Sequence, residues 1–251
     1  MAGKCCADIV FCIDASGSME PCLRGVCENV GRLLEGLRSG QQGQSYWDVR
    51  FDFLTFQDSS EGVSRYHTTG IPGSVGVIRG LYTEPTPSDF FTRDLEQFRQ
   101  SLASVSPNGE ECHLMALDIA LDFPWRPSEE CHRVVILLSD EPVETGVLVD
   151  MQLPVIPKLI EKIMKKKVTL FIAAPESAAF YELAAVDRCV YKDLESVGDG
   201  LEKLDFSDIL ESIGKSVSVS QFYGGGAEEV LPLFGQSEWV PTQRSDLGSD
   251  K

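Results

Sequence analysis

Residues 7–18 read Ala-Asp-Ile-Val-Phe-Cys-Ile-Asp-Ala-Ser-Gly-Ser, a mostly apolar run that ends in three oxygen-bearing side chains. The apolar run predicts a buried strand, and a helical pattern begins a few residues after it. In an extended turn between them, Asp14, Ser16 and Ser18 alternate, so their side chains can converge on one point. A carboxylate with two hydroxyls is a hard-oxygen set, which suits Mg²⁺ or Ca²⁺ and not zinc. A solvated turn with a helix cap would use the same residue types, so the rest of the chain decides between the two interpretations.

The composition limits the possible partners. The chain has 251 residues, of which 43% are hydrophobic, enough for one large domain or two small ones. Its formal net charge is −17, and such a surface repels phosphate backbones and anionic lipid. We therefore expect no nucleic-acid and no membrane partner, whereas cations and basic proteins remain compatible. No apolar run is long enough for a membrane span and no signal peptide is recognisable, so the expected location is cytoplasmic.

The eight cysteines form no metal-binding pattern, since no pair has Cys-x-x-Cys spacing. They are Cys5, Cys6, Cys12, Cys22, Cys27, Cys112, Cys131 and Cys189. In a reducing compartment they are expected to behave as small hydrophobic side chains or unreactive thiols. A zinc site is not expected.

Apolar periodicity predicts strands that alternate with helices. The strand patterns cover residues 7–13, 49–56, 63–68, 134–138, 168–174 and 189–191, and the helical ones lie near 26–37, 95–105, 114–121, 154–166, 177–186 and 206–217. The link between the second and third strands is too short for a crossover helix, so these strands should form an antiparallel hairpin at a sheet edge. The prediction is a doubly wound, Rossmann-like α/β fold. Its sheet would be mostly parallel and six-stranded, with one antiparallel edge strand and helices on both faces.

A second acidic position lies after the fourth predicted strand, at Asp140. In the common strand order 3-2-1-4-5-6, the first and fourth strands are neighbours at the switch point, where ligands bind at the carboxyl ends of strands. Asp14, Ser16, Ser18 and Asp140 are therefore expected to meet at one crevice. Because this turn is expected at the surface, Asp14→Ala should remove a metal without unfolding the chain.

These residues resemble the metal-ion-dependent adhesion site of von Willebrand factor type A (vWA) domains. That site consists of Asp-x-Ser-x-Ser, a Thr in a middle loop and an Asp after the fourth strand. The first and last parts are matched at Asp14, Ser16, Ser18 and Asp140. At the Thr position this chain has Glu111, with Glu110 as the alternative. A carboxylate there could ligate the metal or accept from its water, and it would make the metal less attractive to an incoming carboxylate.

The resemblance spans roughly residues 6–217 and implies a vWA domain over 1–220. A Gly-containing acidic tail over 221–251 would follow, either flexible or docking a partner. Similar domains bind Mg²⁺, Mn²⁺ or Ca²⁺ and leave one coordination position for an acidic residue of a partner protein. Small intracellular members resemble bacterial proteins that work beside AAA+ ATPases, kinases or phosphatases. The resemblance thus implies a non-enzymatic, metal-dependent protein-interaction module of this bacterial type.

The competing interpretation is a phosphatase-like hydrolase with Asp14 as the nucleophile. Such enzymes place a general acid two residues later, where this chain has Ser16. The chain contains no Gly-x-Ser-x-Gly elbow and no Gly-rich phosphate loop, and of its histidines only His113 could reach the crevice. A third interpretation is a scaffold with a vestigial metal site. It would bind partners through apolar residues of the tail, Leu231, Leu233, Phe234 and Trp239.

Overall fold

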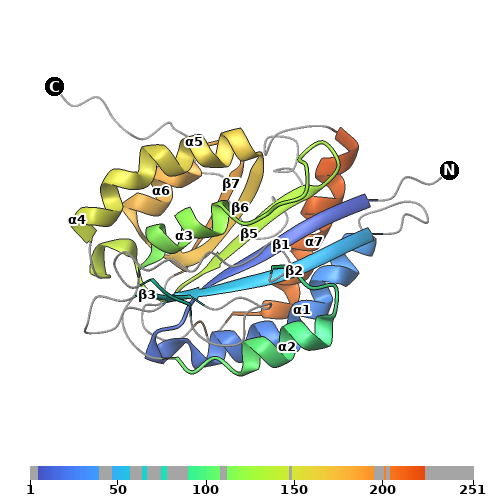
Figure 1. The fold of residues 1–251 in the computed structure, drawn as a ribbon, viewed down its shortest axis with the longest axis horizontal. Helices are drawn as coiled ribbons and strands as arrows, with labels where there is room; N and C mark the ends of the chain where they lie inside the picture. Colours follow the sequence, from blue (N-terminus) through green and yellow to red (C-terminus); the bar gives the residue numbers. More distant parts are fainter. Residues whose placement is uncertain are drawn as a thin grey trace.

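The fold is a parallel sheet between two layers of helices (Figure 1). The computed structural model describes residues 5–39, 47–56, 64–66, 75–77, 90–107, 112–146, 149–194, 201 and 204–223. Within these ranges the main sheet has five strands in the order β2-β1-β5-β6-β7, all parallel. They are β1 (Cys5–Asp14), β2 (Trp47–Phe56), β5 (His132–Leu138), β6 (Val168–Pro175) and β7 (Cys189–Leu194).

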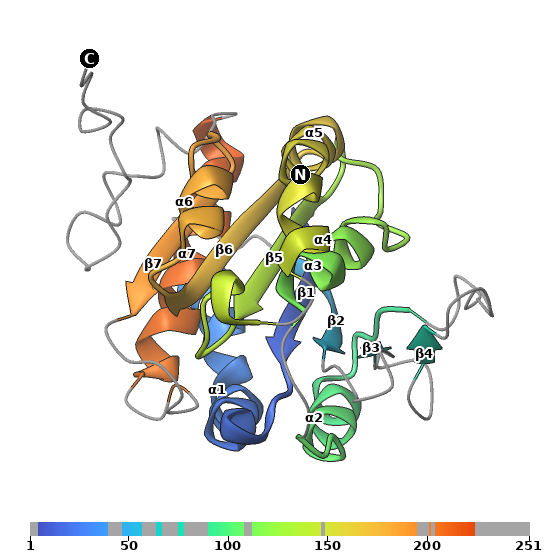
Figure 2. The same ribbon diagram turned by 90° about the vertical axis from the view of Figure 1, so that its left-hand side faces the viewer.

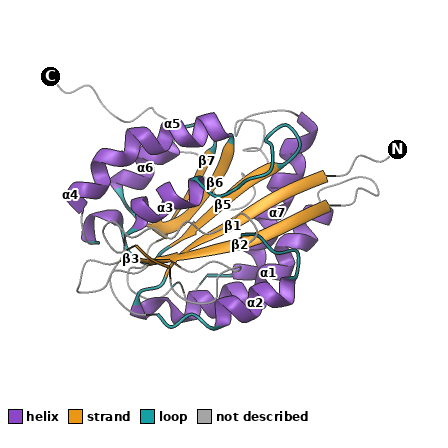
Figure 3. Ribbon diagram, in the orientation of Figure 1, coloured by secondary structure: helices purple, strands orange, loops and turns teal. Residues whose placement is uncertain are grey.

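Helices cover both faces of the sheet, as the secondary-structure colouring of Figure 3 and the end-on view of Figure 2 show. One face packs against α1 (Glu20–Ser39), α2 (Leu95–Ala103) and α7 (Phe206–Tyr223). The other packs against α3 (His113–Leu121), α5 (Ile156–Lys166) and α6 (Ala178–Ala184). Shorter helical segments among the described residues are η1 (Gly17–Met19), η3 (Val143–Thr145), α4 (Val149–Gln152) and η4 (Leu153–Val155). Among the described residues, no helix is both long and apolar enough to cross a bilayer.

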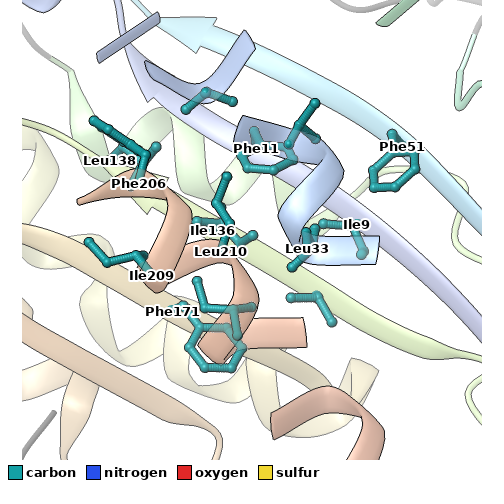
Figure 4. Packing of buried hydrophobic residues seen from close by; sticks show 14 of the residues in the cluster. Ile9, Phe11, Leu33, Phe51, Ile136, Leu138, Phe171, Phe206, Ile209 and Leu210 are labelled. Carbon is teal, nitrogen blue, oxygen red and sulfur yellow. The ribbon is translucent and has the colours of Figure 1, made fainter. Parts of the chain in front are cut away.

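The strand patterns explain the two apolar cores. Successive side chains of a strand point to opposite faces, and both faces of this sheet are covered, so its strands are apolar nearly throughout. In β1, Ile9 and Phe11 belong to the cluster under α1 and α7, and Val10 belongs to the cluster under α3 and α5. Figure 4 shows part of the first cluster, with Phe206, Ile209 and Leu210 of α7 beside Ile136, Leu138 and Phe171 of the sheet.

Helices α1 and α7 touch backbone to backbone. A Cβ atom added at Gly36 would lie 2.2 Å from the carbonyl oxygen of Glu211, and one added at Gly214 would lie 2.3 Å from that of Leu33. No side chain fits in such a gap, so glycine at both positions lets the two helices lie together over the sheet.

The predicted antiparallel edge strand is not found in the main sheet. Within the described chain this sheet has five strands and not six, all parallel. β3 (Ser64–Tyr66), which lies in the predicted segment, pairs with β4 (Val75–Val77) in a separate antiparallel sheet. The outer edge of β2 is occupied elsewhere, because Phe51 and Thr92 exchange two backbone hydrogen bonds of 2.8 Å. The rest of the predicted strand order is confirmed.

A buried ion network closes the amino end of the sheet (right in Figure 1). Asp8 of β1 is fully buried and accepts from Arg50 Nε at 2.8 Å, Arg126 Nε at 2.8 Å and the Arg126 backbone N–H at 2.9 Å. Burial alone would raise the pKa of Asp8, but the hydrogen bonds from both arginines bring it below its usual value. The network joins β1, β2 and the segment before β5 through one carboxylate.

Candidate metal centre

The candidate centre lies where β1 and β5 leave the sheet. These strands are parallel neighbours, and their last paired residues are Ile13 and Leu138. Asp14 and Ser139 therefore emerge side by side, with Asp140 next in the chain. The predicted adjacency of the first and fourth strands is confirmed, and with it the approach of two segments that are far apart in sequence.

Asp14 is held firmly in a buried position. Its side chain is fully buried, the backbone N–H of Ser16 donates to Oδ1 at 2.7 Å, and the Ser139 hydroxyl donates to Oδ2 at 2.9 Å. The backbone N–H of Ala15 donates to the carbonyl oxygen of Phe56 at 2.9 Å, which ties the turn to the end of β2. The expectation of a surface position was wrong: Asp14→Ala would remove buried hydrogen bonds as well as charge.

The two serines of the motif lie together beyond Asp14. The hydroxyl oxygens of Ser16 and Ser18 are 3.2 Å apart, and Ser16 is buried while Ser18 is partly exposed. Neighbouring oxygens around an octahedral cation lie about 2.9 Å apart for Mg²⁺ and about 3.4 Å apart for Ca²⁺, from typical metal–oxygen distances. The hydroxyl pair therefore has the right chemistry and spacing to occupy neighbouring positions on either ion.

The charges of Asp14 and Asp140 both raise the pKa of the Cys22 thiol. Asp140 is fully buried, like Asp14. Burial raises the pKa of Cys22, on α1, well above its usual value, and the charges of Asp14 and Asp140 raise it further. Both carboxylates are thus within electrostatic reach of one sulfur atom, which places negative charge from both strand ends around a single point.

Ser139 joins Asp14 to His113, at the start of α3. His113 Nε2 lies 2.7 Å from Ser139 Oγ. An ionised carboxylate only accepts hydrogen bonds, so the Ser139 hydroxyl donates to Asp14, and His113 Nε2 must carry the proton that it donates to Ser139. The backbone N–H of Glu141 also donates to Ser139 Oγ at 3.1 Å. The hydroxyl is therefore fully hydrogen-bonded and fixes the orientation of the Asp14 carboxylate.

His113 is neutral and enclosed. It is fully buried between the rings of Phe56 and Phe180, whose centroids are 5.3 and 5.7 Å away. Burial lowers the pKa of His113 to about 3, against a smaller opposing effect of the Glu141 backbone. An imidazole that stays neutral and sealed from water serves as a hydrogen-bond donor, not as a general acid or base at pH 7.

Four of the predicted ligand residues are described, and they lie around the ends of β1 and β5: Asp14, Ser16, Ser18 and Asp140. Glu111 and Glu110 lie outside the described residues. In the part of the chain that is described, no three His, Cys, Asp or Glu side chains are placed to hold a metal together. The candidate set therefore depends on two carboxylates and two hydroxyls.

Sequence reasoning missed Ser139 and gave His113 no positioning role. A signal was present, because Ser139 directly precedes the predicted ligand Asp140 at the end of an apolar strand. For His113 no local pattern indicates the contact, since the loop before it and the strand that carries Ser139 come together through the fold.

Comparisons with known proteins support the fold and assign no function. No family model matches the chain. Alpha-protein kinase vwkA of Dictyostelium discoideum is 26% identical over 137 residues, which cover 55% of this chain and 19% of that protein. The human COPII-coat protein Sec24c has a TM-score of 0.55 at 15% identity, over 86% of this chain and 32% of that chain. Proximal thread matrix protein 1 from the mussel byssus has a TM-score of 0.48 at 17% identity, over 87% of this chain and 48% of that chain.

The chain thus spans about a fifth of the kinase and about a third of Sec24c. The similarity to Sec24c concerns the α/β fold alone.

Proposed function

We propose that this chain is a vWA domain whose metal-ion-dependent adhesion site binds a divalent cation and, through it, an acidic residue of a partner protein. The observation that carries the proposal is the junction of β1 and β5. There two fully buried aspartates, Asp14 and Asp140, follow neighbouring parallel strands, and the hydroxyls of Ser16 and Ser18 lie 3.2 Å apart in the same turn.

The electrostatics of the junction favour a cation. Two carboxylates removed from water lose solvation and repel each other, and a divalent ion between them offsets both costs. The donor atoms are hard oxygens, which suit Mg²⁺, Mn²⁺ or Ca²⁺. Asp14, Ser16, Ser18 and Asp140 would hold the ion, with Glu111 as a further ligand or as an acceptor for its bound water.

A bound cation would supply a Lewis-acidic position for a carboxylate from a partner. The residues of this chain would orient the site: Ser139 and His113 hold Asp14 in place, so the carboxylate needs little rearrangement when the ion enters. A carboxylate at Glu111 would reduce the positive charge that the partner meets, so metal binding should be stronger and partner capture weaker than at a site with Thr.

We propose no catalytic activity. Asp14 lacks a general acid two residues later, where Ser16 stands, and the enclosed neutral His113 is unsuited to proton transfer. Partners would be proteins, of the kind found in assemblies with an AAA+ ATPase, a kinase or a phosphatase, and the proposed setting is the cytoplasm. The domain would comprise residues 1–220. α7 continues to Tyr223, and the remainder of the proposed tail lies outside the described residues.

The test is calorimetric titration of MgCl₂, MnCl₂ and CaCl₂ into the wild-type chain and two variants. Asp14→Asn removes the charge but keeps the side-chain size and an acceptor oxygen, and it should abolish binding with the fold retained by circular dichroism. Asp150→Ala, at an exposed carboxylate of α4, is the control and should bind as wild type does. The proposal is contradicted if the wild-type chain shows no heat of metal binding, or if Asp14→Asn binds the metal as well as the wild type does.

A scaffold without metal is the second candidate. It is favoured by the absence, among the described residues, of any three His, Cys, Asp or Glu side chains placed to hold an ion. A pull-down with and without EDTA separates the two functions. Partners lost on chelation support the metal-dependent module, and partners unaffected by chelation support the scaffold.

A further inference from the structure

Two cysteines lie side by side at the amino end of the sheet, at the opposite end from the candidate metal centre. β1 and β5 pair Ala7 with His132, and Cys6 and Cys131 directly precede these two residues. The Cys131 thiol lies within hydrogen-bonding reach of the Cys6 sulfur and of the His132 carbonyl oxygen, which is 3.5 Å away. Two cysteines from segments far apart in sequence are therefore neighbours at the start of adjacent parallel strands.

The two thiols differ in access to solvent. Cys131 is 3% exposed, whereas Cys6 is partly exposed. Cys5, the residue before Cys6, points to the other face of the sheet and is buried in the cluster under α1 and α7. A small oxidant from solution would therefore meet Cys6 first and find Cys131 directly behind it.

Charged neighbours separate the roles of the two thiols. Burial raises the pKa of Cys131, and the hydrogen bond to Cys6 and the charge of Asp8 raise it further, so Cys131 keeps its proton. The Arg126 guanidinium, which binds Asp8, lies within electrostatic reach of both sulfurs. Cys6 is the more exposed of the two sulfurs, so it is the nucleophile that a peroxide from solution meets.

We propose that Cys6 and Cys131 form a reversible intramolecular disulfide when the protein meets a peroxide. In the first step the Cys6 sulfur attacks a peroxide oxygen, the O–O bond breaks, and Cys6 becomes a sulfenic acid while one water leaves. In the second step the Cys131 sulfur attacks the Cys6 sulfur. The S–O bond breaks, and its hydroxyl leaves as water with the Cys131 proton. The two sulfurs lose two electrons in total, the peroxide gains them, and a dithiol reductant reverses the reaction.

The disulfide would bind the start of β1 to the start of β5, the two strands whose far ends carry Asp14 and Asp140. It would close a loop of about half the chain, and such loops restrict the unfolded state strongly. Oxidation is therefore expected to raise the melting temperature.

The experiment treats the full chain with hydrogen peroxide, blocks free thiols with N-ethylmaleimide and maps peptides by mass spectrometry without reduction. The expected result is a linked peptide pair containing Cys6 and Cys131. A rise in melting temperature that dithiothreitol reverses should accompany it. Cys6→Ser and Cys131→Ser should lose both signals. Cys27→Ser is the matched control, since Cys27 is also partly exposed but its sulfur donates to the carbonyl oxygen of Arg99, and it should keep both.

Three results overturn the proposal. The first is alkylation of both thiols after peroxide treatment at concentrations that oxidise exposed cysteines. The second is a disulfide that joins Cys6 to another cysteine, or to a second chain on a non-reducing gel. The third is the same melting-temperature rise in Cys6→Ser as in the wild type. Peptide mapping of the wild type decides the matter even if a serine variant fails to fold.

Discussion

Replacing Gly36 with alanine tests the contact on which the α1–α7 layer depends. The added Cβ would lie 2.2 Å from the carbonyl oxygen of Glu211 and 3.0 Å from its carbonyl carbon. Both atoms belong to the backbone of α7, so no side-chain rotation relieves the clash. Ordinary contact requires the helices to separate by about 1 Å, and close-packed interiors resist such a movement.

The magnitude follows from two opposing effects. Alanine is favoured over glycine in a helix by about 1 kcal/mol, and overpacking costs about 1–3 kcal/mol, with the upper end expected against rigid backbone. Gly36→Ala should therefore lower the free energy of unfolding by about 2 kcal/mol. Gly31→Ala, on the same helix, is the control: its nearest neighbour would be Arg99 Nη2 at 3.4 Å, the far end of a flexible side chain. That variant should gain up to about 1 kcal/mol.

Urea denaturation followed by far-UV circular dichroism measures both variants. The two substitutions should move the midpoint in opposite directions, with the slope unchanged. If Gly36→Ala is as stable as the wild type, α1 and α7 do not touch through their backbones. If Gly31→Ala is destabilised as much as Gly36→Ala, the loss of stability does not come from the backbone contact between α1 and α7.

Three further predictions concern the charged and polar centres. Ser139→Ala removes the hydroxyl that joins the buried His113 to Asp14 of the candidate metal centre. The free energy of unfolding should fall by about 2–3 kcal/mol and any Mg²⁺ affinity should fall with it, while Ser139→Thr should restore both. Glu111→Thr should weaken Mg²⁺ binding about tenfold or more and strengthen the binding of an acidic partner peptide. The reason is that the Glu111 carboxylate would attract the cation and repel the peptide's carboxylate, and unit charges about 4 Å apart interact by roughly 4 kcal/mol at an effective dielectric of about 20. Unchanged calorimetric affinity in both Glu111→Thr and Glu110→Thr would show that neither carboxylate approaches the metal. Asp8 has a folded-state pKa below its ordinary value of 3.8, so its contribution to stability is present above that value and is lost as pH falls through the lower folded-state pKa. Asp8→Asn should lower the free energy of unfolding by about 3–5 kcal/mol at pH 7, because two arginines lose their buried partner. It should also flatten the acidic side of the curve of unfolding free energy against pH, and an unchanged acidic side would contradict the lowered pKa of Asp8.

The sequence by itself determined the five strands of the main sheet, the longer helices that cover it and where the candidate centre lies. Continuous apolar runs such as 134–138 belong to strands covered on both faces, and the apolar spacing of α1 and α7 matches their buried faces. Once the segments alternate, the handedness and shortness of connections leave few arrangements, so the adjacency of β1 and β5 was predictable. That adjacency was enough to bring Asp14 and Asp140 to the same edge of the sheet.

Only the tertiary structure decided which side chains meet within those limits. Thr92 occupies the edge of β2 near Phe51, and β3 pairs with β4, so the described residues do not show the hairpin that was inferred from loop length alone. The link from His113 through Ser139 to Asp14, and the neighbouring positions of Cys6 and Cys131, join segments that carry no pattern pointing to each other. Local periodicity encodes whether a side chain is buried. Which other side chain it contacts depends on the register and spacing of elements that come together only when the whole chain packs.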